Sequence, residues 1–208
     1  MIARKRAEIK SKKTSKKNKS KVLTVITIII IIAISVAAMT FYDFPEEDQK
    51  GDNAFDSGED FVFTSLDGAE IHLNDYRGKV VILDLTATWC QPCQYQMLEL
   101  KKIYENYSRD DLEILSIDMD SRETVQQLQS FKDAFKEYGY ELNWVFGMDD
   151  GSIWEKYKKG GGIPTICIFD QKGKLHFSKE GICIYSEIPQ GFPSDTTQLA
   201  PKIDELLT

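Results

Sequence analysis

The stretch Trp89-Cys90-Gln91-Pro92-Cys93 joins two segments with different hydrophobic patterns. Before it lies a run of strand-forming residues, Val80 to Leu85, and from Cys93 onward apolar residues recur at helical spacing. Free backbone N–H groups and the positive end of the helix dipole meet at the first turn of such a helix, where they stabilise a thiolate. A Cys-x-x-Cys pair at this junction therefore predicts a thiol–disulfide redox site.

The two cysteines are expected to have different roles. Cys90 is predicted to be the exposed nucleophile, and Cys93, one turn deeper, is predicted to resolve the mixed disulfide. Pro92 lies in the opening turn, where its missing N–H would have had no helical partner. A structural Cys90–Cys93 bridge that never turns over is the alternative.

These residues resemble the thioredoxin superfamily, and in particular the membrane-anchored, redoxin-like oxidoreductases of the TlpA/ResA type. Trp89 before the pair and Ile163-Pro164-Thr165 far downstream carry the resemblance, which covers residues 60–208. It implies an α/β thioredoxin-like fold, with a mixed central sheet flanked by helices and an N-terminal β-hairpin extension. It also implies that Pro164 is a cis-proline facing the cysteines. Trp89, Ile163 and Pro164 are then expected to contact the substrate, Ile163 through strand-like backbone pairing. A packing role alone is the alternative for Trp89.

Asp84 stands on the otherwise apolar strand before the pair, and a carboxylate is costly to bury unpaired. It matches the buried acid of thioredoxins, which relays the proton of the resolving cysteine, and burial would raise its pKa towards neutrality. An aspartate satisfied by local hydrogen bonds is the alternative. ResA-type proteins carry a glutamate three residues after the second cysteine, where this chain has Gln96. Asp84 is therefore the only acidic candidate expected near the pair.

The N-terminal part of the chain has the pattern of a membrane anchor. Residues 1–21 hold ten Lys/Arg and one acid, whereas residues 22–41 carry no charge. Twenty helical residues span about 30 Å, the thickness of a bilayer's hydrocarbon core. The acidic residues 42–59 predict a solvated linker. The positive-inside tendency places residues 1–21 in the cytoplasm and the domain 60–208 outside the cell membrane, with a cleaved signal peptide as the alternative.

Charge also limits the partners. Beyond residue 21 the chain holds 16 basic and 32 acidic side chains, a formal charge of −16, so no nucleic-acid partner is expected. The expected partners are an exported thiol or disulfide protein as substrate, a transmembrane electron donor and the membrane itself. No cofactor and no metal are expected. The resemblance favours disulfide reduction, whereas thiolate stabilisation at the helix terminus favours oxidation.

Metal binding and peroxidase chemistry are the alternative uses of the pair. A zinc site needs four ligands, and the remaining soft ligands, His72, Cys167, His176 and Cys183, form no second close pair. A copper-handling module would use both thiolates with a histidine or methionine, but these histidines are distant in the chain. A thiol peroxidase wants a Pro and a Thr/Ser before its cysteine. Here Thr86 and Thr88 precede Cys90 without a proline.

Cys167 and Cys183 admit several interpretations. They are buried free thiols, or they form a structural disulfide, or Cys183 is an auxiliary redox thiol. A hairpin with its turn at 170–173 would place Cys167 beside His176, which does not favour the disulfide. The preceding Gly160-Gly161-Gly162 is either a flexible connector or a loop that lets a partner approach closely.

The remaining elements follow from hydrophobic period and turn signals. Asp195 with Gln198 predicts the start of the last helix. The other predicted elements are a hairpin over 61–73, strands over 112–119, 144–146, 165–169 and 174–178, and helices over 125–138 and 153–157.

Overall fold

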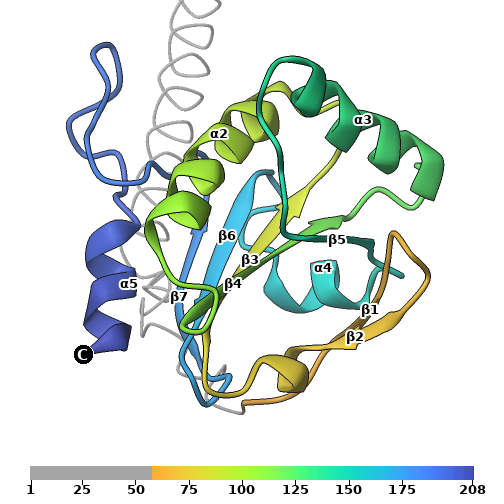
Figure 1. The fold of residues 1–208 in the computed structure, drawn as a ribbon, viewed down its shortest axis with the longest axis horizontal. Coiled ribbons are helices and arrows are strands. Elements are labelled where there is room, and N and C mark those ends of the chain that lie inside the picture. Colours follow the sequence, from red (N-terminus) through yellow and green to blue (C-terminus); the bar gives the residue numbers. More distant parts are fainter. Residues whose placement is uncertain (1–57) are drawn as a thin grey trace, which may run out of the picture. The chain divides into compact units, whose positions relative to one another are not determined.

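The computed structural model describes residues 58–208, which Figure 1 draws in colour. Three predicted segments lie outside the described residues: the basic stretch 1–21, the apolar run 22–41 and residues 42–57 of the acidic linker. Within residues 58–208, no helix is both long enough and apolar enough to cross a membrane.

Strands and helices alternate along the described chain, as the sequence pattern predicts. The elements in chain order are β1 (Val62–Ser65), β2 (Glu70–His72), the 3₁₀ helix η2 (Leu73–Tyr76), β3 (Val80–Thr86), α2 (Gln91–Asn106), β4 (Leu112–Asp118), α3 (Val125–Glu137), β5 (Val145–Met148), α4 (Ser152–Tyr157), β6 (Thr165–Phe169), β7 (Leu175–Glu180) and α5 (Ala200–Leu207).

The seven strands of the described region form one mixed sheet in the order β2-β1-β5-β4-β3-β6-β7. The central strands β3, β4 and β5 are parallel, and the outer pairs are antiparallel. The predicted N-terminal hairpin is confirmed as β1–β2, which joins the sheet through β5. Because β3 and β4 are parallel and in register, both end at the same edge of the sheet, which is where α2 begins.

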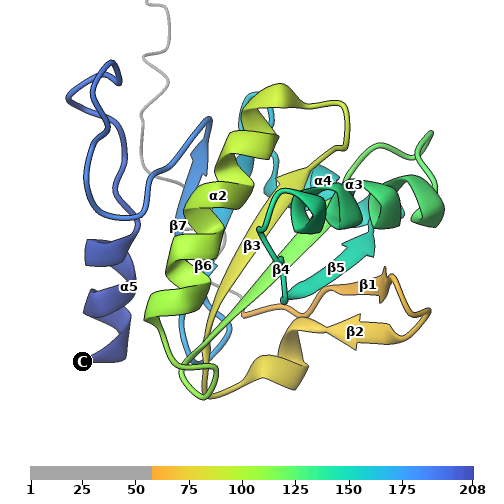
Figure 2. The ribbon, with the colours of Figure 1, turned by 45° about the horizontal axis from the view of Figure 1, so that its top comes forward.

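Helices cover both faces of the sheet (Figures 1 and 2). On one face, alternate residues of β3 such as Ile82 pack with α2, α3 and α5, and on the other face residues such as Leu83 pack with α4. All seven residues of β3 are consequently buried, which explains its nearly continuous apolar sequence. Asp84 follows the alternation of Ile82 and therefore faces α2.

The register of the β6–β7 hairpin differs from the prediction. Cys167 pairs with Ser178, not with His176, because Phe169 at the turn already pairs with Leu175 and the strands then shift register between Ile168 and Phe169. A bulge adds residues to one strand without adding partners to the other. Simple counting back from the turn cannot detect it.

The last helix also begins later than predicted, at Ala200 and not at Asp195. The segment before it pairs with the chain that follows β7: Gln198 forms a parallel bridge with Ile184, and Leu199 N–H donates to the Ile184 carbonyl at 2.9 Å. These backbone hydrogen bonds replace the expected helical cap.

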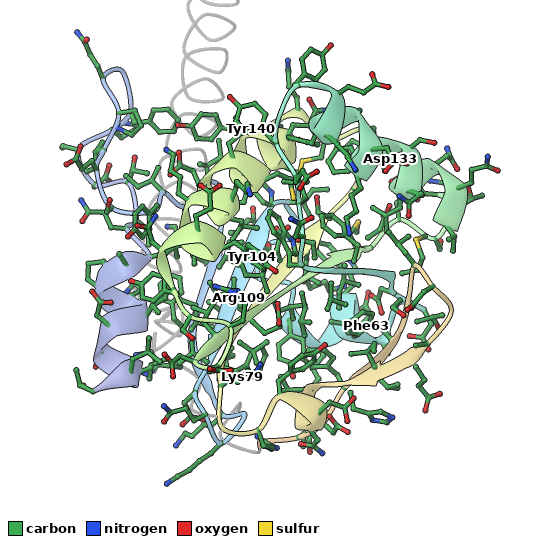
Figure 3. All side chains as sticks on the ribbon, viewed as in Figure 1. Phe63, Lys79, Tyr104, Arg109, Asp133 and Tyr140 are labelled. Carbon is green, nitrogen blue, oxygen red and sulfur yellow. A yellow bond between two sulfur atoms is a disulfide. The ribbon has the colours of Figure 1, made fainter. Side chains whose placement is uncertain are left out.

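The Gly147→Ala substitution is expected to destabilise the junction between the hairpin and the sheet. A Cβ at this β5 position would lie 2.3 Å from the ring of Phe63, which is labelled in Figure 3, and 2.6 Å from the Thr64 carbonyl oxygen. The backbone atom cannot move aside, so we expect a loss of about 2–3 kcal/mol in the free energy of unfolding. Urea denaturation measures it, and an unchanged midpoint would contradict the close approach.

Candidate active site

The Cys90–Cys93 pair lies between the end of β3 and the first turn of α2. Cys90 is the N-cap residue of α2, and its Sγ accepts a hydrogen bond from the backbone N–H of Cys93 at 3.2 Å. The two sulfurs form a disulfide with the Cα atoms 5.2 Å apart. Pro92 occupies the opening turn, as predicted. The helix terminus thus directs an N–H group at the sulfur on which a thiolate would form.

The expectation that Cys90 is exposed is wrong for this disulfide state. Only 4% of Cys90 is accessible, and Cys93 is fully buried. Both sulfur-bearing residues pack with Ala87 and Ile163, which cover them from the side. A reaction partner can therefore reach only the small accessible part of Cys90 in this state.

Ile163 packs against the pair and precedes Pro164. Their peptide bond is cis, and the Ile163 carbonyl oxygen lies 3.8 Å from Cys90 Sγ. Ile163 is half-buried against the cysteines, and Pro164 is buried. The Ile163 carbonyl is a backbone acceptor beside the reactive sulfur.

Trp89 is 60% exposed beside Cys90, although its indole is held in place. The indole Nε1–H donates to Asp120 Oδ2 at 2.8 Å, and Arg122 binds the same carboxylate through two of its nitrogens, at 2.8 and 2.6 Å. The hydrogen bond fixes the ring while leaving its faces free to touch a partner.

Asp84 is fully buried beneath α2. Its Oδ2 accepts a hydrogen bond from Ser116 Oγ at 2.9 Å, and the same hydroxyl touches Met97 of α2 at 3.9 Å. Asp84 Oδ1 has no hydrogen-bond partner within residues 58–208. Burial raises the Asp84 pKa to about 7, and the Ser116 hydrogen bond offsets only part of that effect. The local hydrogen bonds therefore do not satisfy this carboxylate.

Gln96, which replaces the glutamate of ResA-type proteins, is used structurally. Its Oε1 accepts the backbone N–H of Cys183 at 2.8 Å, and its Nε2 is buried without a partner in the described part of the chain. Gln96 thus ties α2 to the segment that precedes α5.

Sequence reasoning missed a second group of acids beside the pair, so Asp84 is not the only acid there. Asp118, Asp120 and Glu123 lie at the end of β4 and in the loop before α3, and the latter two bind the Thr88–Trp89 segment directly. The available signal was positional. Neighbouring parallel strands end at a common edge, so acids after β4 belong beside the residues after β3.

Cys167 and Cys183 are free thiols, so a disulfide between them is wrong for this structure. They belong to core clusters on opposite faces of the sheet. Burial raises the pKa of Cys167 to about 11 and that of Cys183 to about 12, which makes both poor nucleophiles. They pack as small hydrophobic residues.

The glycine run before Ile163 is not an open space. Glu180 accepts the backbone N–H of Gly160 at 2.7 Å, and a Cβ at Gly162 would lie 2.3 Å from the same carboxylate. The Glu180 side chain at the end of β7 therefore holds this loop, which argues against a purely flexible connector.

A groove of about 430 Å³ lies next to the site, between the first half of α2 and the end of α3. Tyr140, labelled in Figure 3, is one of the residues that line it. Gln91 and Gln94 link the groove to the cysteine turn, and its remaining lining is mainly apolar and aromatic: Tyr95, Leu98, Phe131, Ala134, Phe135 and Tyr138. The groove thus places an apolar and aromatic surface next to the cysteine turn.

The histidines do not approach the cysteines. His72 lies on edge strand β2 with Asp60 and Glu70, and His176 lies on the opposite edge strand β7. No group of three His, Cys, Asp or Glu residues within 58–208 has the arrangement of a metal site.

Residues 55–178 match the AhpC/TSA family, and this span is more than half of the chain. The chain belongs to the AhpC/TSA family. This family member is 32% identical over 115 residues to the thiol-disulfide oxidoreductase ResA of Bacillus cereus. The matched segment covers 55% of this chain and 62% of the length of that protein. The chain is 30% identical over 137 residues to the thioredoxin-like protein YneN of Bacillus subtilis, which covers 65% of this chain and 76% of that one.

The fold has a counterpart among solved structures. The exposed lipoprotein thioredoxin Etrx1 of Streptococcus pneumoniae superposes with a TM-score of 0.53 at 26% identity, over 71% of this chain and 100% of that chain. The predicted thioredoxin-like fold is therefore confirmed.

Proposed function

We propose that this AhpC/TSA family member is a thiol–disulfide oxidoreductase that reduces disulfides of exported proteins. The observation that carries the proposal is the sulfur of Cys90 at the N-terminus of α2, bonded to Cys93 and facing the Ile163 carbonyl. The likeness to proteins named ResA and YneN supports the same chemistry.

The reaction follows from the positions of the two sulfurs. In the reduced dithiol, the Cys90 thiolate attacks one sulfur of the substrate disulfide, and the other leaves as a thiolate that takes a proton. Asp84 accepts the proton of Cys93, whose sulfur then attacks Cys90 and releases the second substrate thiol. Two electrons pass to the substrate, and Cys90–Cys93 becomes the disulfide seen here.

Asp84 suits the role of proton acceptor because of its pKa. A base works best when its pKa lies near the working pH, and burial brings the pKa of Asp84 to about 7. The carboxylate lies beneath α2, the helix whose first turn carries Cys93. It is therefore on the buried side of the pair.

A polypeptide substrate fits the surroundings of Cys90. The Ile163 carbonyl offers strand-like pairing to an extended peptide, and Trp89 with the aromatic groove offers apolar contact. The surface is suited to shape and backbone recognition.

The proposal includes an anchor and an electron source. The uncharged run 22–41 holds the domain at the outer side of the cell membrane, because the basic residues 1–21 stay in the cytoplasm. A reductase in that oxidising compartment must be reduced again after each cycle. A transmembrane dithiol electron donor is the reductant that this topology requires.

The two rival functions lack support at the site. For a thiol peroxidase, the Thr88 hydroxyl is already committed to Glu123, and Thr86 is fully buried. For copper handling, neither histidine joins the cysteine pair. The site offers two sulfurs, a buried acid and a backbone acceptor.

Trapping tests the function and the location together. In cells that produce the full chain, Cys93→Ala is expected to accumulate a mixed disulfide at Cys90, because the resolving sulfur is gone while the attacking one remains. Reducible adducts are isolated and their protein partners identified, with Cys90→Ser/Cys93→Ala as the matched control. Exported partners would support the proposal. Cytoplasmic partners would refute the location, and absence of adducts together with peroxide consumption would indicate a peroxidase.

A further inference from the structure

The segment before Cys90 is held by a carboxylate from the next βα connection. The Thr88 backbone N–H donates to Glu123 Oε2 at 2.8 Å, and the Thr88 hydroxyl donates to Glu123 Oε1. On its other side, the Thr88 carbonyl accepts from the Gln94 side chain at 3.5 Å. Thr88 is only two residues from Cys90, so the direction in which the sulfur points depends on these contacts.

A second carboxyl group stands behind Glu123. Asp118, the last residue of β4, is fully buried, and its Oδ1 accepts the backbone N–H of Asp120 at 2.9 Å. Its Oδ2 has no donor within residues 58–208, and the group beside it is the Glu123 carboxylate. Two adjacent carboxylates in a buried site cannot both be ionised at low cost. A proton on Asp118 Oδ2 removes the repulsion and supplies the missing hydrogen bond.

The positions of the donors decide which acid holds the proton. Glu123 receives two hydrogen bonds from Thr88 and a third from a protonated Asp118, so its charged form is favoured and its pKa is lowered despite partial burial. Burial first, and then the hydrogen bond to Glu123, raise the pKa of Asp118 to about 8. The pair thus carries one proton and one negative charge near neutrality.

We propose that Asp118 and Glu123 share one proton as a positioning pair, which holds the Thr88–Trp89 segment and through it the orientation of Cys90. Neither residue touches the reacting sulfurs. When the shared proton is lost, the two carboxylates repel each other, Glu123 turns to solvent, and Thr88 loses its acceptor. The effect of this pair on the reaction rests on the proposed oxidoreductase function.

The other charged groups around the pair do not take over this role. The Asp120 carboxylate is engaged by Arg122 and by the Trp89 indole. Asp149, which follows β5, directs its carboxylate to the N–H groups of Ile153 and Trp154. Asp120 adds a further negative charge near both acids, and the guanidinium of Arg122 is mainly neutralised by it.

The decisive experiment follows the Trp89 indole in the oxidised full chain, in which neither Cys90 nor Cys93 titrates. The chain is labelled with ¹⁵N-tryptophan in detergent micelles, and Trp89→Phe assigns the indole signal. Asp118 accepts a hydrogen bond from the Asp120 N–H, and the carboxylate of Asp120 binds the Trp89 indole. The chemical shift of the indole is therefore expected to follow the titration of Asp118 near pH 8. Asp118→Asn keeps a donor towards Glu123 and is expected to abolish this titration. Asp84→Asn, which removes the other buried acid, is expected to leave it intact.

Turnover of the reduced chain provides the second measurement. At pH 7, Asp118→Asn is expected to keep exchange activity within about twofold, whereas Asp118→Ala and Glu123→Ala lower it about tenfold, because a misoriented sulfur reacts slowly. Glu137→Gln, on the exposed end of α3, is the matched control.

The possible outcomes distinguish a failure of the proposed Asp118–Glu123 pair from a failure of the proposed function. An indole titration that persists in Asp118→Asn, or is missing in the wild-type chain, overturns the pair even if exchange is catalysed. An equal loss of activity in Asp118→Asn and Asp118→Ala also overturns it, because the shared hydrogen bond would then be irrelevant. If the titration behaves as expected but no variant, nor the wild type, catalyses exchange, the pair stands and the proposed function falls.

Discussion

Cys90→Ser is expected to lower disulfide reduction by at least about a thousandfold, to the uncatalysed rate. A serine hydroxyl stays protonated at neutral pH and forms no bond that a thiol can resolve, so the first step of exchange is lost entirely. Reduction of a protein disulfide by the pre-reduced chain, followed under single-turnover conditions, measures the effect. Cys183→Ala, which removes a buried free thiol, is the matched control and is expected to stay within about twofold.

The reactivity of the Cys90 thiol supplies an independent check. In the reduced chain its alkylation at pH 6 should be faster than that of free cysteine, because the helix terminus and the Cys93 N–H stabilise the thiolate. If Cys90 reacts no faster than free cysteine while the domain stays folded, the pair is structural. A loss of the same size in Cys183→Ala would also contradict the assignment, because it would point to a different reactive thiol.

Asp84→Asn is expected to stabilise the oxidised fold in a pH-dependent way. The pKa of Asp84 is about 7 in the folded chain against 3.8 for an ordinary aspartate, so the native state binds more protons than the unfolded state between these values. Stability therefore falls as the pH rises from about 4 to 7 and stays low above that range. Removing this titration should raise the free energy of unfolding by about 3 kcal/mol at pH 8.

Urea denaturation of the oxidised chain at pH 4.5 and pH 8 tests this expectation. The gain should be large at pH 8 and small at pH 4.5, where the wild-type carboxyl is already neutral. Some pH dependence will remain, because Asp118 titrates with the same sign. Asp195→Asn, at an exposed position, should change neither value. If the free energy of unfolding of Asp84→Asn differed from that of the wild type by the same amount at both pH values, the raised pKa would be contradicted.

The same variant should slow catalysis while it stabilises the fold. Without the carboxylate, Cys93 loses its proton acceptor, and general-base effects are typically worth about 10²–10⁴ in rate. We expect the mixed disulfide to form at a normal rate and to resolve about a hundredfold more slowly at pH 7. Quenched-flow separation of the two steps measures this. A slower first step with normal resolution would assign Asp84 to Cys90 instead.

Several parts of the site could be predicted from sequence because their signals are local. The Cys90–Cys93 spacing, the strand before it and the apolar period after it define the junction without long-range information. Asp84 was visible because a lone acid on an apolar strand conflicts with its neighbours. The pairing of β6 with β7 was not predictable in detail, because a bulge between Ile168 and Phe169 leaves no mark in the hydrophobic pattern.

The delivery of two cysteines by a strand to a helix terminus could be predicted from the local sequence, since both elements and the turn between them are encoded in one short stretch. The surroundings of those sulfurs depend on long-range packing. It brought the Ile163 carbonyl to Cys90, buried Asp84 beneath α2, separated Cys167 from Cys183 on opposite faces of the sheet, and set Asp118 and Glu123 behind Thr88. Each of these contacts joins residues from different strands or helices. Their positions depend on sheet order and register, which no local pattern specifies.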